Sequence, residues 1–278
     1  EDAEGNQFVW IPVGTYTATD VESEEDPKPT TTKTNNLVRR SWGDADEVVD
    51  PTEITADEQI SGSSSSYFYY GEGNENSCTK NGDGTNSIDD FKSSATENGG
   101  FYIGRYEAGT DTERTSYDNP LTTPLVQANK AVYVYVTRDQ AKTQAEAMYA
   151  NNGNINVTSQ LISSYAWDTV LNFICQNSEQ GYLLATTTDE VYGNNGTMSK
   201  EQTGGYPNDK HSNIYDLLGN CYEWTTEYYS NGDYPCVLRG GGYSFSIYFA
   251  ATRLYDSTSL SDSNYSFRLQ LYIGRSES

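Results

Sequence analysis

Residues 236–273 read CVLRGGGYSFSIYFAATRLYDSTSLSDSNYSFRLQLYI, and this stretch carries the strongest information on the fold. It opens on a glycine-rich turn, Arg239–Gly242, and closes on an alternating run, Phe267–Ile273. Every second residue of that run is apolar, which is the pattern of a half-buried β-strand. Two framework pieces therefore flank a segment of different character, Tyr243–Ser266.

Serine and tyrosine dominate this intervening segment, with seven and four of its 24 residues. It contains no Lys, Glu, Gln, Met or Trp, the residue types that codons ending in a pyrimidine cannot encode. Antibody-type binding surfaces favour the same mixture, because tyrosine gives rigid amphipathic contact area and serine gives adaptable hydrogen bonds. A serine-rich loop with a few core aromatics would have a similar composition, so both interpretations stay open.

Four short motifs follow one another between residues 213 and 268. They are NIYDLLGNCYEW at 213–224, LRGGGY at 238–243, AATR at 250–253 and NYSFR at 264–268. This order resembles the formylglycine-generating-enzyme (sulfatase-modifying factor) family, which reads G-L-Y-D-M-x-G-N-V-W-E-W, L-R-G-G-S-W/Y, A-x-R and N-x-G-F-R. FVWIPVGTY at 8–16 and GFYIGRYEAG at 100–109 resemble earlier family segments. Four motifs in register are a specific signal, whereas one alone is weak.

The resemblance implies an α+β fold of the C-type-lectin-like, formylglycine-generating-enzyme type. It would have two helices packed on short antiparallel strands and much irregular loop, with residues 1–278 as a single domain. One branch of the family is similar to the variable proteins of diversity-generating retroelements, in which adenine-directed mutagenesis replaces Asn codons between the R-G-G and F-R motifs. This branch implies a C-terminal variable, ligand-binding region at 237–273.

The family's enzymes oxidise a substrate cysteine with two cysteines placed between R-G-G and A-x-R. The corresponding segment, Tyr243–Phe249, has no cysteine, so it offers no thiolate for copper or for a redox pair. The single histidine, His211, lies near Asp209 and Ser212 in a polar stretch, and one imidazole cannot build a zinc or non-haem iron site. We predict a protein that is not an enzyme; a formylglycine-generating oxidoreductase or its degenerate relative is the alternative.

The predicted ligand-binding side chains come from three parts of the variable region. They are Ser244, Phe245, Ser246, Ile247, Tyr248 and Phe249; Leu254, Tyr255 and Asp256; and Ser259, Leu260, Ser261, Asp262, Ser263 and Tyr265. The four aromatic anchors are expected to be Tyr248, Phe249, Tyr255 and Tyr265, because aromatic residues dominate binding hot spots.

The resemblance also implies where such a protein acts. Its partner would be a surface protein or glycan of a host or neighbouring cell. The protein itself would belong to a phage virion, at the tail-fibre tip, or to a bacterial surface or secreted fraction. A purely structural virion module is a third hypothesis. The net charge of −23 argues against nucleic acid and anionic membranes as partners, and no apolar run is long enough to span a bilayer.

Residues 17–98 carry eighteen acidic and six basic side chains, which predicts a solvated acidic insertion. Within it, Ser66–Tyr70 has the composition of a strand, and Ile88–Ser93 that of a short helix capped by Ser87. Asn81–Gly84 hints at a calcium loop, although Thr79 stands where an EF-hand has its first carboxylate. No cofactor is required, and calcium is a candidate structural ion.

Local signals place two helices in the middle of the chain. Thr137 and Gln140 form a capping-box pattern that starts a helix reaching about Ala150, and apolar spacing predicts a second helix over 159–175. Glu223 is expected to pair with one of the framework arginines at positions 239, 253 and 268.

The four cysteines are Cys78, Cys175, Cys221 and Cys236. Cys221 and Cys236 are close enough in sequence to pair across neighbouring strands, but buried free thiols are the preferred interpretation.

Overall fold

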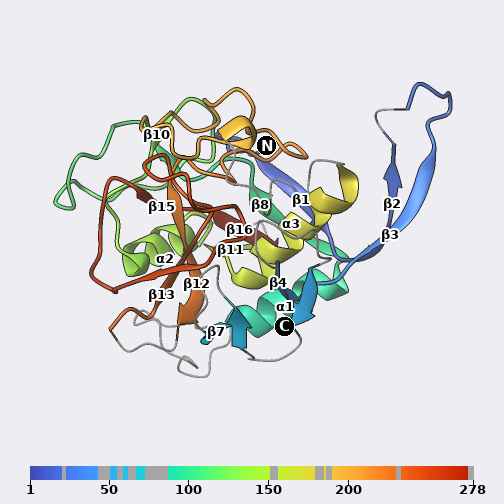
Figure 1. Ribbon diagram of the computed structural model, residues 1–278, viewed down its shortest axis with the longest axis horizontal. Helices are drawn as coiled ribbons and strands as arrows, with labels where there is room; N and C mark the ends of the chain where they lie inside the picture. Colours follow the sequence, from blue (N-terminus) through green and yellow to red (C-terminus); the bar gives the residue numbers. More distant parts are fainter. Residues whose placement is uncertain are drawn as a thin grey trace.

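The computed structural model describes residues 1–20, 23–42, 51–54, 59–61, 67–72, 87–150, 156–178, 185, 190–229 and 233–274. Its first sheet has four antiparallel strands in the order β1-β8-β16-β11 (Figure 1). They span Phe8–Pro12 (β1), Gly100–Gly104 (β8), Leu269–Ile273 (β16) and Val157–Leu161 (β11). The alternating run of the C-terminal stretch is therefore a central strand, which brings the two ends of the chain into one sheet.

The second sheet carries most of the C-terminal stretch that precedes β16. Its strands run in the order β14-β13-β12-β7-β6, and β15 pairs in parallel with β12. They span Leu254–Asp256 (β14), Cys236–Arg239 (β13), Tyr222–Tyr229 (β12), Tyr67–Glu72 (β7), Gln59–Ser61 (β6) and Tyr265–Phe267 (β15). Every residue of β12 is buried, so this strand is the axis around which the others pack.

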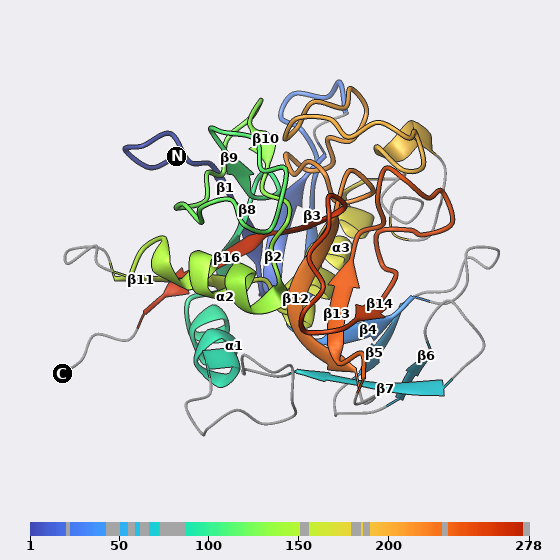
Figure 2. The same cartoon turned by 90° about the vertical axis from the view of Figure 1, so that its left-hand side faces the viewer.

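Three helices cover the sheets: α1 (Ser87–Glu97), α2 (Arg138–Ala147) and α3 (Ser164–Asn177), with a 3-10 turn η1 at Glu190–Tyr192. α1 packs on β8 and β16, and α2 packs on β11 and β12. α3 contacts both β1 and β12, and in Figure 2 it lies beside β12 and β13. Its ring of buried side chains, with Trp167 at 0 % exposure, makes it the shared core of both sheets.

Three further hairpin-like pairs complete the fold. β2 (Gly14–Thr19) pairs with β3 (Thr30–Asn35), β4 (Arg39–Ser41) with β5 (Thr52–Ile54), and β9 (Gly109–Thr110) with β10 (Ala131–Val132). Figure 1 shows β2 and β3 reaching away from the body of the molecule.

The acidic composition of residues 17–98 predicted a solvated insertion, and the described part of this segment also contributes residues to the core. Arg39, Arg40 and Trp42 are buried, and Phe91 of α1 packs in the core against Phe101. β7 also pairs with β12 inside the second sheet. The acidic composition reflects the exposed positions between these contacts, because net charge does not reveal which few residues of a segment reach the core. The strand predicted at 66–70 is confirmed as β7, and the helix at 88–93 as α1; Ser66, Thr79 and Asn81–Gly84 lie outside the described residues.

Both predicted helices are present, but the second one starts at a different residue from the one predicted. The capping box at Thr137 is confirmed in both directions, and α2 follows it. The second predicted helix starts later than residue 159, because Val157–Leu161 forms β11, and Ser163 is the N-cap of α3. That makes three helices in the described chain rather than two.

The cysteines do not pair as the alternative required. Cys221 is a buried free thiol and Cys175 is a half-buried free thiol. Cys236 forms a disulfide, and its partner is neither of these two. The prediction of buried free thiols therefore holds for Cys221 and fails for Cys236.

Candidate ligand-binding surface

The loop that follows β13 is fixed to the framework through its backbone. Gly240 and Gly241 have φ values of +94° and +78°, a left-handed conformation that glycine adopts without strain. Beyond them, Tyr243 N–H donates to Asn220 O at 2.9 Å, and the Tyr243 carbonyl accepts from Met198 N–H at 2.8 Å. Backbone contacts do not depend on side-chain identity, so side chains beyond this turn can change without releasing the loop.

A second loop, between β14 and β15, is held in the same manner. The Asp262 carbonyl accepts from Tyr135 N–H at 3.0 Å, and the Asn264 carbonyl accepts from Tyr222 N–H at 2.8 Å. Within the loop, the Asp262 carboxylate accepts from Asn264 N–H at 3.0 Å and from the Ser263 hydroxyl at 3.1 Å. The path of this loop is therefore set by its own turn and by backbone bonds to Tyr135 and to Tyr222 of β12. It does not depend on the aromatic ring of Tyr265.

The Tyr222 ring joins the two loops into one surface. Its centroid lies 5.7 Å from that of Tyr248 in the first loop and 5.8 Å from that of Tyr265 after the second, both in edge-on geometry. Tyr265 also donates from its hydroxyl to Asp256 Oδ2 at 3.1 Å, which adds β14 to the same face. We call the residues gathered in this way the ligand surface: Ser244–Tyr248, Leu254, Asp256 and Ser259–Tyr265.

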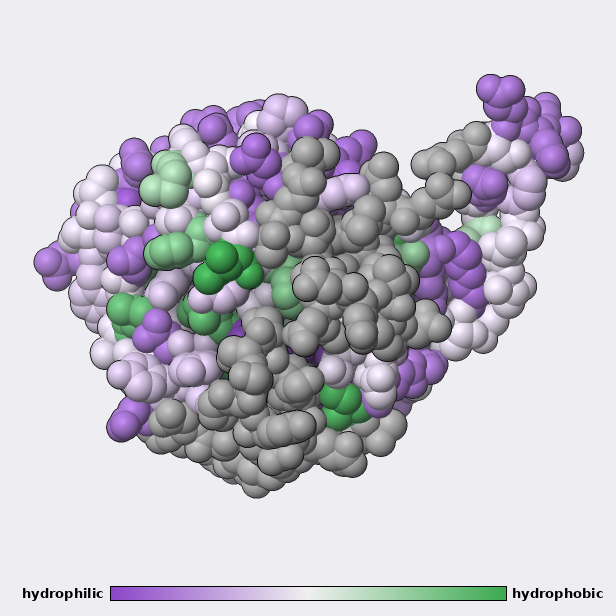
Figure 3. All heavy atoms as spheres, viewed as in Figure 1, coloured by the Kyte–Doolittle hydropathy of each residue, from purple (hydrophilic) through white to green (hydrophobic). Residues whose placement is uncertain are grey.

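Exposure divides the predicted binding residues. Phe245 and Ile247 are 57 % and 65 % exposed, and Ser246 and Ser259 are exposed as well, whereas the remaining residues of the ligand surface are half-buried. Figure 3 shows apolar residues gathered in the left half of the view, over the loops that surround β15 in Figure 1. A contiguous patch of exposed apolar side chains marks an interaction site, whereas single exposed ones are ordinary.

Two predicted anchors do not belong to this surface. Phe249 is 6 % exposed and packs in the core with α3 residues, so it supports the loop from beneath. Tyr255 points to the opposite face of β14, where it stacks on Tyr229 with ring centroids 4.3 Å apart. The alternation of side chains along a strand explains the second correction, because Leu254 and Asp256 take the face that Tyr255 leaves.

The surface also contains buried polar atoms that bond to nothing within the described chain. They are the hydroxyls of Tyr222, Ser244 and Ser261 and the side-chain oxygen of Asn264. Buried polar groups in native proteins nearly always find a partner, in protein, water or ligand.

Sequence reasoning missed two residues of this region. Tyr222 lies inside the NCYEW motif and was interpreted only as framework, and Met198, 74 % exposed, lies in a separate loop that bonds to Tyr243. The signal for Tyr222 was its aromatic ring on a strand next to the variable loops; Met198 has no sequence signal at all.

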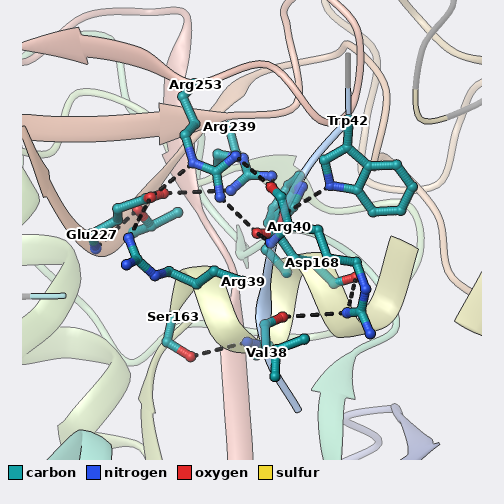
Figure 4. Close-up of polar contacts among 12 residues, drawn as sticks. Val38, Arg39, Arg40, Trp42, Ser163, Asp168, Glu227, Arg239 and Arg253 are labelled. Carbon is teal, nitrogen blue, oxygen red and sulfur yellow. Dashed lines mark hydrogen bonds and ion pairs between the residues drawn. The ribbon is translucent and has the colours of Figure 1, made fainter. Parts of the chain in front are cut away.

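Beneath the surface, a buried ion network ties the motif arginines together (Figure 4). Asp168 of α3 accepts from Arg239 Nη2 and Arg253 Nη2, both at 2.6 Å, and from the indole N–H of Trp42 at 3.1 Å. Burial alone would raise the pKa of Asp168, but the two arginines outweigh it and lower this pKa to about 2.

Glu227 of β12 completes this network. It accepts from Arg253 Nε at 2.8 Å and from Arg239 Nη1 at 3.4 Å, and Arg39 lies 3.8 Å away. Arg239 comes from the R-G-G motif and Arg253 from the A-x-R motif, so both ends of the first loop are fastened to α3 and β12. Such pairs position loops, because a planar guanidinium fixes both distance and orientation.

The expectation that Glu223 pairs with one of the three motif arginines is confirmed, and its partner is Arg268. Arg268 donates to Glu223 from Nε at 3.1 and 3.0 Å and from Nη2 at 2.6 Å, and also to the carbonyls of Gly104 and Tyr215. Arg239 and Arg253 pair with Asp168 and Glu227 instead. The last motif is thus bonded to β12 and β8 at once.

The lone histidine is not part of a catalytic triad. His211 is buried, its Nε2 lies 3.0 Å from the Tyr192 carbonyl, and burial lowers its pKa. Asp209 accepts from Asp216 N–H, at 3.3 Å. Among the described residues, no group of three or more His, Cys, Asp or Glu side chains is arranged to hold a metal ion. The calcium hint at 81–84 lies outside them, so calcium stays a prediction.

Two packed sheets, helices beneath them and motif-bearing loops above define an α+β domain of C-type-lectin-like type. The chain matches the Sulfatase-modifying factor enzyme 1-like domain over residues 110–272 and belongs to this family. No curated protein sequence matches the chain. None of the helices in the described ranges has the length and apolar character needed to cross a membrane.

Solved structures with a similar fold include three that differ widely in sequence. PvdO from Pseudomonas aeruginosa is 13 % identical, with 98 % of this chain and 96 % of that one covered, and a TM-score of 0.47. CarF is 15 % identical, with coverage of 63 % and 87 % and a TM-score of 0.44. Variable protein 1 of Treponema denticola is 13 % identical, with coverage of 62 % and 84 % and a TM-score of 0.43.

Proposed function

We propose that the chain is a non-enzymatic binding protein, a variable protein of a diversity-generating retroelement that displays the ligand surface on a C-type-lectin-like scaffold. The observation that carries this proposal is the exposure of Phe245 and Ile247 on a loop whose backbone is fastened independently of its side chains. Such a loop can vary in sequence while its path is kept.

The chemistry of the first loop supports the same function. The segment between the R-G-G and A-x-R motifs, where the family's enzymes carry their cysteines, has none here. Its place is taken by Ser, Phe, Ile and Tyr, which bind by contact area and hydrogen bonds. The partner we propose is a protein or glycan on the surface of a host or neighbouring cell, reached from a virion or a bacterial surface.

A saturation library tests whether the surface is built to vary. Positions 245, 246, 247 and 259 are randomised together and displayed, with protease resistance as the measure of folding; a matched library randomises positions 249, 253, 267 and 268. We expect most members of the first library to stay folded and most of the second to unfold. Equal loss in both libraries would contradict the proposal.

The genomic neighbourhood tests the retroelement itself. We expect a reverse-transcriptase gene and a near-identical copy of the 237–273 coding stretch that differs at adenines. The alternative, a formylglycine-generating oxidoreductase, predicts copper binding and oxidation of a cysteine peptide, and either result would replace the present proposal.

A further inference from the structure

A pocket lies on the first sheet, separate from the ligand surface. It has a volume of about 240 Å³ and is lined mainly by aromatic and aliphatic side chains of β1, β8, β11 and β16, with Glu1 and Asp2 at its edge. In Figure 2 the N-terminus and β11 lie on one side of the molecule, and the loop between β13 and β14 lies on the other. The pocket shares no residue with the ligand surface.

Strand pairing explains how the walls are formed. Trp10 of β1 pairs with Tyr102 of β8, and Tyr102 pairs with Leu271 of β16, so their side chains share one face of the sheet. Trp10 and Tyr102 remain 38 % and 42 % exposed. Their ring centroids are 4.9 Å apart with planes at 66°, which makes two walls of a corner.

The carboxylate beside this corner is already saturated with hydrogen bonds. Asp2 Oδ1 accepts from the N–H groups of Glu4 and Asn6 at 3.0 and 2.8 Å, and Oδ2 accepts from Asn6 Nδ2 at 2.9 Å and from the Tyr149 hydroxyl. Burial of Asp2 favours its neutral form, but these bonds outweigh burial and lower its pKa, so the group is charged at neutral pH. Its four acceptor positions are occupied by these groups, and none of the four donors is a basic side chain.

We propose that this pocket binds a quaternary or methylated ammonium group on a short apolar stem. A quaternary ammonium group has no N–H to donate, and a methylated one has few. Either group is attracted by the charge of the Asp2 carboxylate and does not need a free lone pair on its oxygens. Aromatic faces attract it through their quadrupole, and the attraction grows where rings form adjoining walls. A guanidinium would fit less well, since it seeks two free acceptor positions on a carboxylate.

Trp10 provides the readout for a direct test. Of the four tryptophans, the other three are at most 3 % exposed, so a ligand in the pocket changes Trp10 fluorescence selectively. Choline and its neutral carbon isostere, 3,3-dimethylbutan-1-ol, are titrated separately into the full chain. We expect saturable binding of choline, about threefold tighter than that of the isostere, as an exposed cation–π site predicts.

Two matched pairs of variants locate the effect. Tyr102→Phe keeps the ring and should bind choline normally, whereas Tyr102→Leu should weaken binding about threefold. Asp2→Asn should weaken it, whereas Asp118→Asn, an equal charge change at an exposed position, should not. All variants are first checked for an unchanged melting temperature.

The proposal is overturned if choline gives no saturable change, if the isostere binds as tightly, or if Tyr102→Leu and Asp2→Asn leave choline binding unchanged. Nα-acetyl-Nε-trimethyllysine is compared with choline to identify the source of the group. Tighter binding of the lysine derivative indicates a protein partner, and tighter binding of choline indicates a choline-bearing headgroup. Neither outcome depends on the ligand surface or its proposed function.

Discussion

At the scale of single residues, Asp168 is predicted to have a large effect on stability. It is fully buried between Arg239 and Arg253, and its removal leaves Glu227 as the one carboxylate that both guanidinium groups contact. We expect Asp168→Asn to cost about 3–5 kcal/mol of unfolding free energy, measured by urea denaturation at pH 7. Glu53→Gln is the control: Glu53 is 41 % exposed and pairs with Arg40 at 3.3 Å, so its loss should cost less than about 1 kcal/mol.

The pH dependence of Asp168 gives an independent check. Because its pKa in the folded state is lowered to about 2 from the ordinary value of 3.8, the stability it contributes is present above 3.8 and is lost as pH falls toward 2. The wild-type chain should lose stability across that window more steeply than Asp168→Asn. If the free energy of unfolding changed with pH in the same way in both chains, the network would not favour the ionised form of Asp168.

Asp209 shows the opposite behaviour. Burial, followed by the nearby Asp216, raises its pKa to about 9. The folded chain therefore keeps a proton that the unfolded chain releases near 3.8, so stability falls as pH rises from about 4 to 9. Asp209→Asn should reduce this slope by up to about 1.4 kcal/mol per pH unit. The difference in unfolding free energy between the variant and the wild-type chain should therefore shift in favour of the variant between pH 5 and pH 8. Chemical denaturation at both pH values measures it, and an unchanged slope would contradict the raised pKa.

At the scale of elements, the two helix starts differ in what their caps bond. Thr137 caps α2 through a local capping box. Ser163 caps α3 by accepting from Ala166 N–H at 3.2 Å and also donates to Gln270 of β16 at 3.0 Å, fully buried. We expect Thr137→Ala to cost about 1 kcal/mol and Ser163→Ala about 2 kcal/mol, because the second also leaves Gln270 with one bond fewer. Equal losses in urea denaturation would refute the difference.

These helices also show what the sequence could predict. The start of α2 was readable because all its signals lie within four residues. The start of α3 was not, since Val157–Leu161 has apolar residues that fit a helix or a strand, and its pairing with β16, more than a hundred residues later, decides for the strand. Local sequence patterns report contacts between residues that are close in the chain, and they do not identify the partner strand in a sheet.

At the scale of the whole molecule, the same limit separates the contacts that were predicted from those that were not. The pairing of Glu223 with a motif arginine was predicted, because such residues stand in recognisable motifs, but the choice of Arg268 among the three arginines was not. The partners of Arg239 and Arg253, Asp168 and Glu227, were not predicted, because both lie outside the four motifs. The position of the ligand surface followed from composition, whereas the side of each aromatic depended on the packing of α3 and on strand alternation.

Phe245 and Phe249 turn this distinction into a measurement on the folded protein. They lie four residues apart in one loop, yet Phe245 is 57 % exposed and Phe249 packs under the loop at 6 %. Phe249→Ala should cost about 3–5 kcal/mol, because a buried ring leaves a cavity, whereas Phe245→Ala should change stability by less than about 0.5 kcal/mol. Thermal and urea unfolding of both variants measure the contrast. If Phe245→Ala were the more damaging change, the loop would depend on its exposed ring, and a surface meant to vary in sequence could not be built on it.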